Sequence, residues 1–315
     1  MNLSLLVTGL AVIAIIAFLI LFMTRGLSSQ PSAYDVNYII NIKRKLLSKW
    51  PSSFDINTLI DIPVAYINLD QSTGRRNRME GIFDTYNLLP RPVRIRAVWG
   101  TKYLKNPSAE PWISPELHPL LRDLVDSGRT TPGELGCLLS HMKAILYGYQ
   151  SNLPSLLVLE DDADFSCVGL WNHSLSTLIG RLPSSDWNYV QLYYDCNEFV
   201  IESELARIDD GILCYGTVAY IISARCMAAL YKIMFDNFVL TTRMYHVLQK
   251  AGLHFSSDIA IYNILSPKNV YIEKLQRFAM DNFEASLDST IHTDHTRRHW
   301  TFTKQIWNRY LGTQN

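Results

Sequence analysis

The sequence has no excess of either charge. Its 315 residues include 29 Lys and Arg and 29 Asp and Glu, so the formal net charge is zero. Nucleic-acid-binding proteins usually carry a basic excess or a basic stripe, and we therefore expect no nucleic-acid partner. The sequence also has no internal repeat and no low-complexity tract. With 48% apolar and 18% charged residues, it has the composition of a globular protein rather than a disordered one.

Cysteine is sparse, and its spacing forms no recognisable motif. The chain has five cysteines and no C-x-x-C pair; they are Cys137, Cys167, Cys196, Cys214 and Cys226. This pattern argues against a zinc module and against a dense disulfide framework, and it does not fix the redox compartment. We interpret each cysteine as a small apolar residue of the core.

Charge is absent from residues 3–23, LSLLVTGLAVIAIIAFLILFM, a run long enough to cross a bilayer. A cleaved signal peptide has a basic n-region, a shorter apolar run and a small-residue cleavage site. Here no Lys or Arg precedes the run, which ends in Phe22-Met23-Thr24-Arg25. We therefore predict an uncleaved transmembrane anchor over residues 1–25 and count the membrane among the partners.

A stem over residues 26–61 is predicted to follow the anchor. Within it, YIINIKRKLLSKW (38–50) is basic, and its apolar residues have near-helical spacing: Ile39, Ile42, Leu46 and Trp50. Such a helix can lie on a membrane surface rich in anionic lipid, or it can pack on the adjoining domain. The sequence leaves both alternatives open.

Residues 62–285 are predicted to form an α/β domain, with helices on both faces of one sheet, followed by a tail over 286–315. Segments rich in β-formers alternate with segments of helical periodicity. Strands are expected at 62–70, 92–100, 156–160, 187–195 and 216–223. Helices are expected at 72–89, 130–150 and 225–235, and before Leu182. A loop punctuated by Pro107, Pro111, Pro115 and Pro119 is expected between the second strand and the helix at 130–150.

Four carboxylates stand where the predicted strand LLVLE ends. The stretch LLVLEDDADF (156–165) carries Glu160, Asp161, Asp162 and Asp164. Ligands in α/β folds bind beyond the carboxyl ends of strands, and the strand ends at 68–70 and 195 are polar as well.

These acids have three possible interpretations: a solvated loop, a calcium loop and an open divalent-metal site. An EF-hand starting at Asp162 is rejected, because Cys167 and His173 would occupy the positions of its central Gly and bidentate Glu. A Mg²⁺ or Mn²⁺ site with carboxylates and substrate phosphates remains, since a cation would relieve the repulsion between these acids.

Three arginines follow the strand end at Asn68–Asp70. Arg75, Arg76 and Arg78 lie at the entry of a predicted helix, where a guanidinium can meet phosphate oxygens bidentately. The alternative is a solvated basic helix face. Together with a metal site, these arginines suggest a phosphorylated or nucleotide-bearing substrate.

Several blocks of the sequence, taken in order, resemble glycosyltransferase family 25: YINLDQSTGRRNRME, RAVWG, GELGCLLSHMKAIL, LLVLEDDADF and GTVAYIISARCMAAL. The resemblance runs from about Val64 to about Met234 and weakens toward Glu284. The family includes bacterial lipooligosaccharide galactosyltransferases and collagen galactosyltransferases. The resemblance implies a GT-A type fold and inverting transfer of a sugar, often galactose, from a UDP-sugar donor to a glycan, lipid-linked or protein acceptor.

The resemblance also implies roles for individual residues. It assigns Glu160 and Asp162 to a divalent metal, Mn²⁺ or Mg²⁺, and Asp161 to the same motif. Residues near the nucleotide or the border of the cleft would be Asn68, Asp70, Arg75, Arg76, Arg78, Glu134 and His141. A lone histidine beside apolar residues is also typical of a structural role, so we give His141 a supporting one. Members commonly carry Asp where this sequence has Trp99, which leaves the acceptor unassigned.

Inversion requires a base that takes the proton of the acceptor hydroxyl. Asp258 and Asp195 are the candidates, and the resemblance favours Asp258; both have the alternative of a helix-capping or structural acid. In the tail, His292, His295 and His299 lie near one helical face. They suit a metal site, but a solvated or partner-binding tail is favoured.

The membrane side of the domain stays open. Arg25 and the basic residues at 43–49 favour the cytoplasm. The resemblance favours the secretory lumen in a eukaryotic host and the cytoplasm in a bacterium. Asn172-His173-Ser174 is an acceptor sequence for lumenal N-glycosylation.

Two other functions compete with a glycosyltransferase. One is an inactive family member that serves as a binding or scaffold module, against which the intact Glu160-Asp161-Asp162 speaks. The other is a metal-dependent phosphoesterase, which usually needs a second set of acids or histidines that the sequence does not clearly place.

Overall fold

The computed structural model describes residues 33–51, 53–194, 205–207, 216–250, 257, 260–261, 269–273 and 277–280. The chain divides into two compact units, residues 1–44 and 45–315, and the sheet and site described below belong to the second. Among the described helices, none is long and apolar enough to cross a bilayer. The predicted anchor, Asp195, Asp258 and the tail over 286–315 lie outside the described residues.

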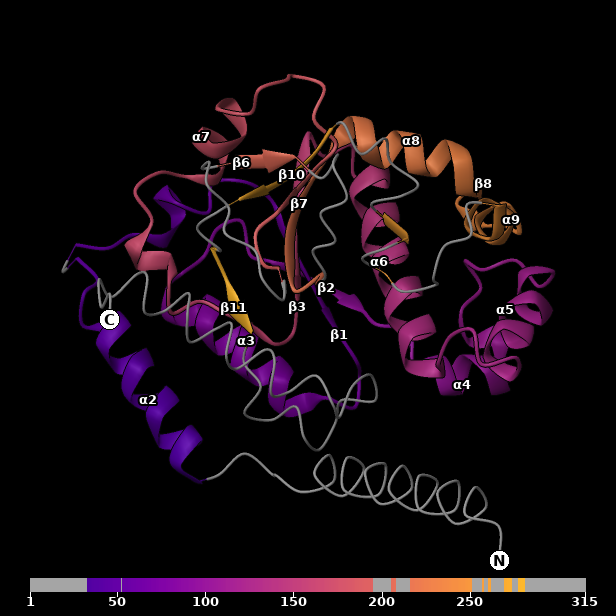
Figure 1. Ribbon diagram of the computed structural model, residues 1–315, viewed down its shortest axis with the longest axis horizontal. Coiled ribbons are helices and arrows are strands. Elements are labelled where there is room, and N and C mark those ends of the chain that lie inside the picture. The colour runs from indigo at the N-terminus through magenta and orange to yellow at the C-terminus, as the bar shows by residue number, and fades with distance from the viewer. Residues whose placement is uncertain are drawn as a thin grey trace, which may run out of the picture. The chain divides into compact units, whose positions relative to one another are not determined.

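A mixed sheet forms the centre of the second unit (Figure 1). Within the described part of the chain it has seven strands in the order β2-β1-β3-β7-β5-β10-β6. Their bounds are β1 Val64–Asn68, β2 Val93–Arg96, β3 Ser155–Glu160, β5 Tyr189–Gln191, β6 Leu205–Arg207, β7 Ala219–Ser223 and β10 Val270–Glu273. This agrees with the predicted α/β class.

The strand directions decide which residues meet at one edge. β1 is parallel to both β2 and β3, whereas β7 runs antiparallel to β3 and β5. The carboxyl ends of β1 and β3 therefore lie beside the amino end of β7. This edge collects Asn68, Glu160 and Thr217, which come from three distant parts of the sequence.

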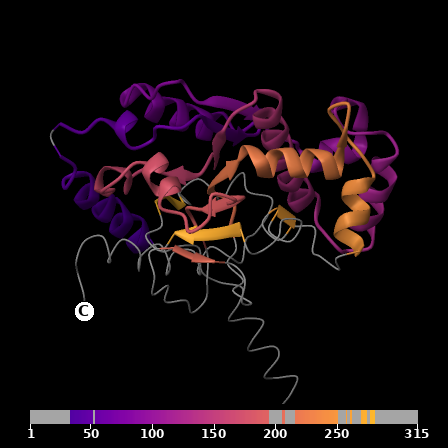
Figure 2. The same ribbon diagram turned by 90° about the horizontal axis from the view of Figure 1, so that it is seen from above.

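Helices cover both faces of the sheet (Figures 1 and 2). On one face, α6 (Pro132–Gln150) and α8 (Ala224–Met234) pack on alternate strand residues such as Ala65 and Val158. On the other face, α3 (Thr73–Thr85) and α7 (Leu175–Gly180) pack on Val64 and Leu157. Every residue of β1 is buried, as expected of a parallel strand covered on both sides.

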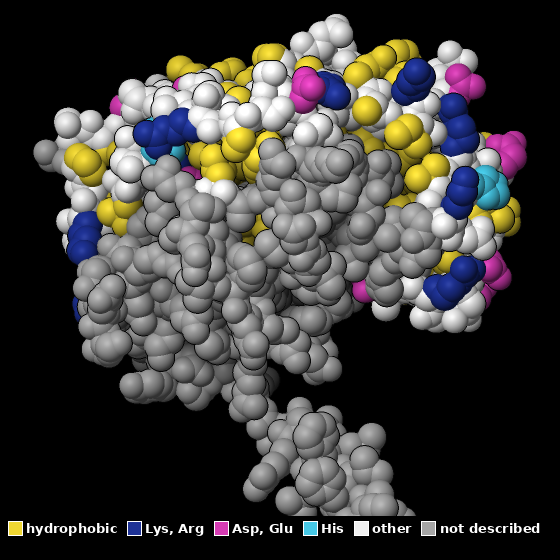
Figure 3. All heavy atoms as spheres, turned by 45° about the horizontal axis from the view of Figure 1, so that its top comes forward, with side chains coloured by type: hydrophobic (Ala, Val, Ile, Leu, Met, Phe, Trp, Pro, Cys, Tyr) yellow, Lys and Arg dark blue, Asp and Glu magenta, His cyan; other side chains and the backbone are white. Residues whose placement is uncertain are grey.

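The remaining elements complete the unit. They are η1 Ile56–Thr58, α4 Gly100–Lys105, η2 Pro107–Ala109, α5 Leu117–Asp126, β4 Ala163–Asp164, η3 Val168–Leu170, β8 Phe235–Asp236, β9 Val239–Leu240, α9 Arg243–Lys250 and β11 Ala279–Met280. The helix α2 (Ala33–Leu47) begins in the first unit. In Figure 3, side chains of both charge signs are interspersed over the described surface of one face.

The proline-punctuated loop was predicted wrongly. Residues 100–126 contain two α-helices, and Pro119 lies in the first turn of α5. That turn tolerates proline because its backbone N–H groups have no partner within the helix. Leu117, Leu121 and Leu124 at helical spacing are fully buried.

The segment 38–50 ends differently from the prediction. Its helix stops at Leu47, so Trp50 is not on the helix. The Trp50 indole donates to the carbonyl of Ser166 at 3.1 Å, and its ring lies so close to Gly169 that an added Cβ would be 2.4 Å away. Leu46 is fully buried. The end of this segment thus packs on the domain, while binding of the helix to a membrane surface stays a prediction.

Candidate active site

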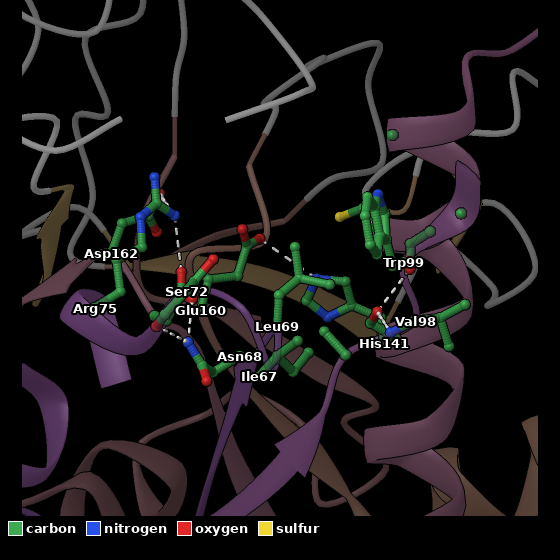
Figure 4. Close-up of a pocket in the computed structure, with 17 residues that line it drawn as sticks. Ile67, Asn68, Leu69, Ser72, Arg75, Val98, Trp99, His141, Glu160 and Asp162 are labelled. Atoms are coloured by element: carbon green, nitrogen blue, oxygen red, sulfur yellow. Dashed lines mark hydrogen bonds and ion pairs between the residues drawn. The ribbon is translucent and has the colours of Figure 1, made fainter. Parts of the chain in front are cut away.

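A pocket opens at the sheet edge where β1 and β3 end (Figure 4). Its walls come from these strand ends, the start of α3, the loop between β2 and α4, and the first turns of α6. The polar and aromatic lining residues include Asn68, Ser72, Arg75, Trp99, Cys137, Ser140, His141, Glu160, Asp161 and Asp162. This is the position at which open α/β sheets bind ligands.

Two glycines allow one wall to form. Gly100 and Gly136 lie so close together that a Cβ on Gly136 would be 2.8 Å from the Gly100 nitrogen and 2.6 Å from the Val98 carbonyl. Ser140 ties the same loop to α6, because its hydroxyl accepts from the Val98 amide at 2.8 Å and donates to the Gly136 carbonyl at 2.6 Å. The block GELGCLLSH therefore shapes the pocket through backbone contact.

Glu134 stabilises the start of α6. Its carboxylate accepts from the Thr131 amide at 2.8 Å, and the Thr131 hydroxyl accepts from the Glu134 amide at 3.1 Å. This reciprocal pair is a capping box, with Pro132 in the first turn. Glu134 is not part of the pocket lining, so its predicted contact with the nucleotide gains no support from its position.

Asp161 connects the two strand ends. Its Oδ2 accepts from Asn68 at 2.7 Å, its Oδ1 accepts from Arg75 at 2.8 Å, and its backbone carbonyl accepts from Arg78. Both carboxylate oxygens are thereby used within the protein. We interpret Asp161 and the buried Asn68 as residues that position their neighbours.

Asp162 and Arg75 each leave a polar atom without a hydrogen-bond partner among the described residues. The atoms are Oδ1 of Asp162 and Nη2 of Arg75, and both are buried. Oδ2 of Asp162 lies 3.7 Å from Nη1 of Arg75. A buried, unpaired polar group is costly, and a ligand with a cationic and an anionic part would satisfy both of these atoms.

The electrostatics agree with such a ligand. Burial, together with the charges of Glu160 and Asp161, raises the pKa of Asp162 to about 7 despite the opposing charge of Arg75. A bound cation would stabilise the ionised form. Burial alone would lower the pKa of Arg75, but the charges of Asp162 and Asp161 outweigh it and raise that pKa.

Glu160 faces a different set of partners. Its Oε1 lies 3.3 Å from Nε2 of His141 (Figure 4). The same oxygen accepts from the Thr217 hydroxyl at 2.6 Å. Burial favours a higher pKa for Glu160, but the hydrogen bonds from His141 and Thr217, helped by the charge of Arg75, lower it. The other ring nitrogen of His141 lies 3.0 Å from the Tyr220 hydroxyl. Glu160 is therefore held as a carboxylate at the pocket.

The comparison with protein families gives this geometry a context. Residues 62–175 match the model of glycosyltransferase family 25, described as LPS biosynthesis protein. The matched stretch is thus similar to members of glycosyltransferase family 25. The enzyme class is thereby a glycosyltransferase, as the resemblance implied. A search among curated proteins found no match.

The matched region contains all the residues that line the pocket. Asn68, Arg75, His141 and the stretch Glu160–Asp162 all fall within residues 62–175. Thr217 and Tyr220, which fix Glu160 and His141, come from β7 and its approach, beyond the matched residues. The site therefore depends on a longer piece of chain than the family match covers.

The other predicted residues either do not line this pocket, although Arg78 bonds the Asp161 carbonyl beside it, or lie outside the described residues. Asp70 is exposed and pairs with Arg94 at 2.7 Å, and neither Arg76 nor Arg78 lines the pocket. Asp195 and Asp258 lie outside the described residues. The neighbour of Asp258, Ser257, is described, and its hydroxyl lies 3.1 Å from that of Thr217.

Sequence reasoning missed Thr217, Tyr220 and Cys137. The first two lie within the block GTVAYIISARCMAAL, but no role was predicted for them, because their position at the site depends on β7 running antiparallel beside β3. Cys137 was interpreted as a core residue, but it is half-buried and lines the pocket. Its place four residues before His141 on one helix was the available signal. Cys167 and Cys226 are buried as expected.

Proposed function

We propose that this chain is a membrane-anchored, metal-dependent glycosyltransferase of the GT-A type. It would transfer a hexose, with galactose as the first candidate, from a UDP-sugar to a hydroxyl of a glycan, glycolipid or glycoprotein, with inversion. Residues 1–25 would be the anchor. Sugar transfer is proposed from the match to family 25. The metal and the nucleotide donor are proposed from the residues of the pocket.

The proposal rests on the two buried atoms that have no hydrogen-bond partner among the described residues, Oδ1 of Asp162 and Nη2 of Arg75. A nucleoside diphosphate with its divalent cation offers what they need: a cation for Oδ1 of Asp162 and phosphate oxygens for Nη2 of Arg75. The donor set fits Mn²⁺ or Mg²⁺, since Asp162 and Glu160 supply carboxylate oxygens from the same strand end. When bound, the cation would neutralise charge that develops on the leaving diphosphate.

The protein's own residues would do the rest. Arg75 would bind the diphosphate and stabilise its growing charge in the transition state. Asn68 and Asp161 would hold Arg75 and the two strand ends in place. Holding the donor sugar in line with the acceptor hydroxyl is the positioning part of the reaction. Asp258 or Asp195 would take the hydroxyl proton.

The decisive experiment is a screen of nucleotide sugars for donor hydrolysis and transfer, with and without Mn²⁺ or Mg²⁺. We expect turnover of a UDP-sugar only with a divalent cation, and loss of that turnover in Asp162→Asn. Asp126→Asn is the matched control, because Asp126 is exposed and outside the pocket. UDP binding without any turnover would instead support an inactive binding module.

A further inference from the structure

A second set of metal-ligating groups lies in the wall of the pocket. The Cys137 thiol, a ring nitrogen of His141 and a carboxylate oxygen of Glu160 all lie within 4.8 Å of one another. Cys137 and His141 are four residues apart on α6 and so share one face of the helix. Glu160 approaches them from the end of β3.

This ligand set differs in chemistry from the acids that hold Mn²⁺ or Mg²⁺. Those ions prefer oxygen ligands, whereas thiolate and imidazole select zinc and related borderline metals. Zinc takes four ligands in tetrahedral geometry, and three protein ligands leave one position for water or a substrate atom. The three groups line the pocket, so this open position would face it.

The surroundings are those of a metal-binding histidine. Nδ1 of His141 lies 3.0 Å from the Tyr220 hydroxyl. In the metal-bound state this hydroxyl would accept the proton of Nδ1, and the lone pair of Nε2 would bind the metal in place of its hydrogen bond to Glu160. Nε2 already lies 3.3 Å from Oε1 of Glu160, which the Thr217 hydroxyl holds at 2.6 Å. The three ligand atoms, all within 4.8 Å of one another, are already close to the spacing of ligands around one metal ion.

We propose that Cys137, His141 and Glu160 form a zinc site. Zinc would bind His141 through the lone pair of Nε2 and Cys137 as the thiolate, so binding releases the thiol proton. Because Glu160 is also a ligand of the proposed catalytic cation, zinc removes one of that cation's two carboxylates. Zinc binding should therefore inhibit sugar transfer. This inhibition rests on the proposed function, whereas zinc binding itself does not.

Binding is tested on the metal-free full chain, without nucleotide sugar. Zinc is titrated against a chromophoric chelator, and cadmium is added as a probe whose thiolate bond gives an ultraviolet charge-transfer band. We expect a single zinc ion per chain and a cadmium band in the wild type. Cys137→Ser should abolish the band, and both Cys137→Ser and His141→Gln should weaken zinc binding at least about tenfold.

Two controls test whether the effects are specific to the three ligands and whether each variant is folded. Asp126→Asn should keep the cadmium band and the zinc affinity, because Asp126 is exposed and outside the pocket. Thermal unfolding monitors the fold of each variant, and Cys137→Ala is a second thiol-free variant. The absence of a cadmium band in the wild type would overturn the proposal, as would an unchanged band in folded Cys137→Ser. If zinc binds but no nucleotide sugar is turned over, the proposed function fails while the zinc site stands.

Discussion

Arg75 and Arg76 are neighbours in the sequence, but only one of them faces the pocket. Nη1 of Arg75 pairs with Asp161 at 2.8 Å, and its Nη2 has no hydrogen-bond partner in the described part of the chain. Arg76 lies outside the pocket lining. The difference between adjacent residues makes them a matched pair for mutation.

We predict that Arg75→Ala weakens UDP binding by about 1–3 kcal/mol, the range for hydrogen bonds to charged groups. Arg75→Lys should recover only part of this loss, because lysine lacks the planar fork. Isothermal titration calorimetry with UDP and Mn²⁺ measures the effect, and Arg76→Ala should bind as the wild type does. Wild-type affinity in Arg75→Ala would exclude a clamp on the diphosphate.

The raised pKa of Asp162 predicts that the stability of the metal-free protein depends on pH. Its folded pKa of about 7 lies above its ordinary value of 3.8, because burial and Glu160 disfavour the charge. Between these values the folded state retains a proton that the unfolded state has lost. The free energy of unfolding should therefore fall as pH rises from about 4 to about 7, by no more than about 1.4 kcal/mol per pH unit from this group.

Asp162→Asn cannot titrate and should lack this component. Urea unfolding in the presence of a chelator, repeated from about pH 4 to about pH 8, compares the two proteins. Identical pH profiles would show that Asp162 is not a buried acid with a raised pKa. The substitution also leaves the fold intact in our prediction, since it removes a repulsive charge and keeps the size.

At the scale of elements, the pocket depends on the contact between α6 and the loop before α4. A Cβ on Gly136 would meet two backbone atoms, the Val98 carbonyl at 2.6 Å and the Gly100 nitrogen at 2.8 Å. Neither can rotate away as a side chain does. Gly81 on α3 is the counterpart, because a Cβ there would meet nothing within 4 Å.

We predict that Gly136→Ala destabilises the protein by about 1–3 kcal/mol, the usual cost of overpacking, and impairs nucleotide binding by displacing the pocket wall. Gly81→Ala should instead stabilise it by about 0.4–1 kcal/mol. Chemical denaturation of both variants checks the signs. A Gly136→Ala variant as stable as Gly81→Ala would show that the loop can move away from α6.

Glu134 allows a second test at this scale. Glutamine can replace glutamate in a capping box, so Glu134→Gln should keep both α6 and nucleotide binding, whereas Glu134→Ala should lose about 0.5–2 kcal/mol of stability. Thermal unfolding and UDP titration separate the two properties. If Glu134→Gln folds normally but loses UDP affinity, the carboxylate contacts the nucleotide as the family resemblance first suggested.

At the scale of the whole molecule, the predicted membrane topology can be tested through Asn172. Asn172 is exposed, and Ser174 of the same acceptor sequence caps α7 by accepting from the Thr177 amide at 3.2 Å. In eukaryotic cells we expect one uncleaved span over residues 3–23, with the domain in the lumen. Gel mobility of wild type and Asn172→Gln, before and after glycosidase, reports lumenal modification. Complete digestion of the domain by protease outside sealed microsomes would contradict this topology.

Much of the fold could be predicted because its signals are local. The strand at 64–68, the helix that begins at Thr73 and the helix entered through Thr131 and Glu134 are each specified by residues a few positions apart. Hydrophobic periodicity and caps act over one turn or one strand. The helix α5 was missed because prolines were counted as breaks, although the first turn of a helix accepts one.

The sequence alone determined where the acids of the site lie along the chain: at the end of a buried strand, within a region of family 25 character. Only the tertiary structure decided which partner each of these acids contacts. Asp161 bonds Asn68, 93 residues away, while Glu160 meets Thr217, 57 residues away on the approach to an antiparallel strand. Strand order and direction decide such pairs, because local periodicity fixes which face a side chain takes but not which distant segment lies opposite.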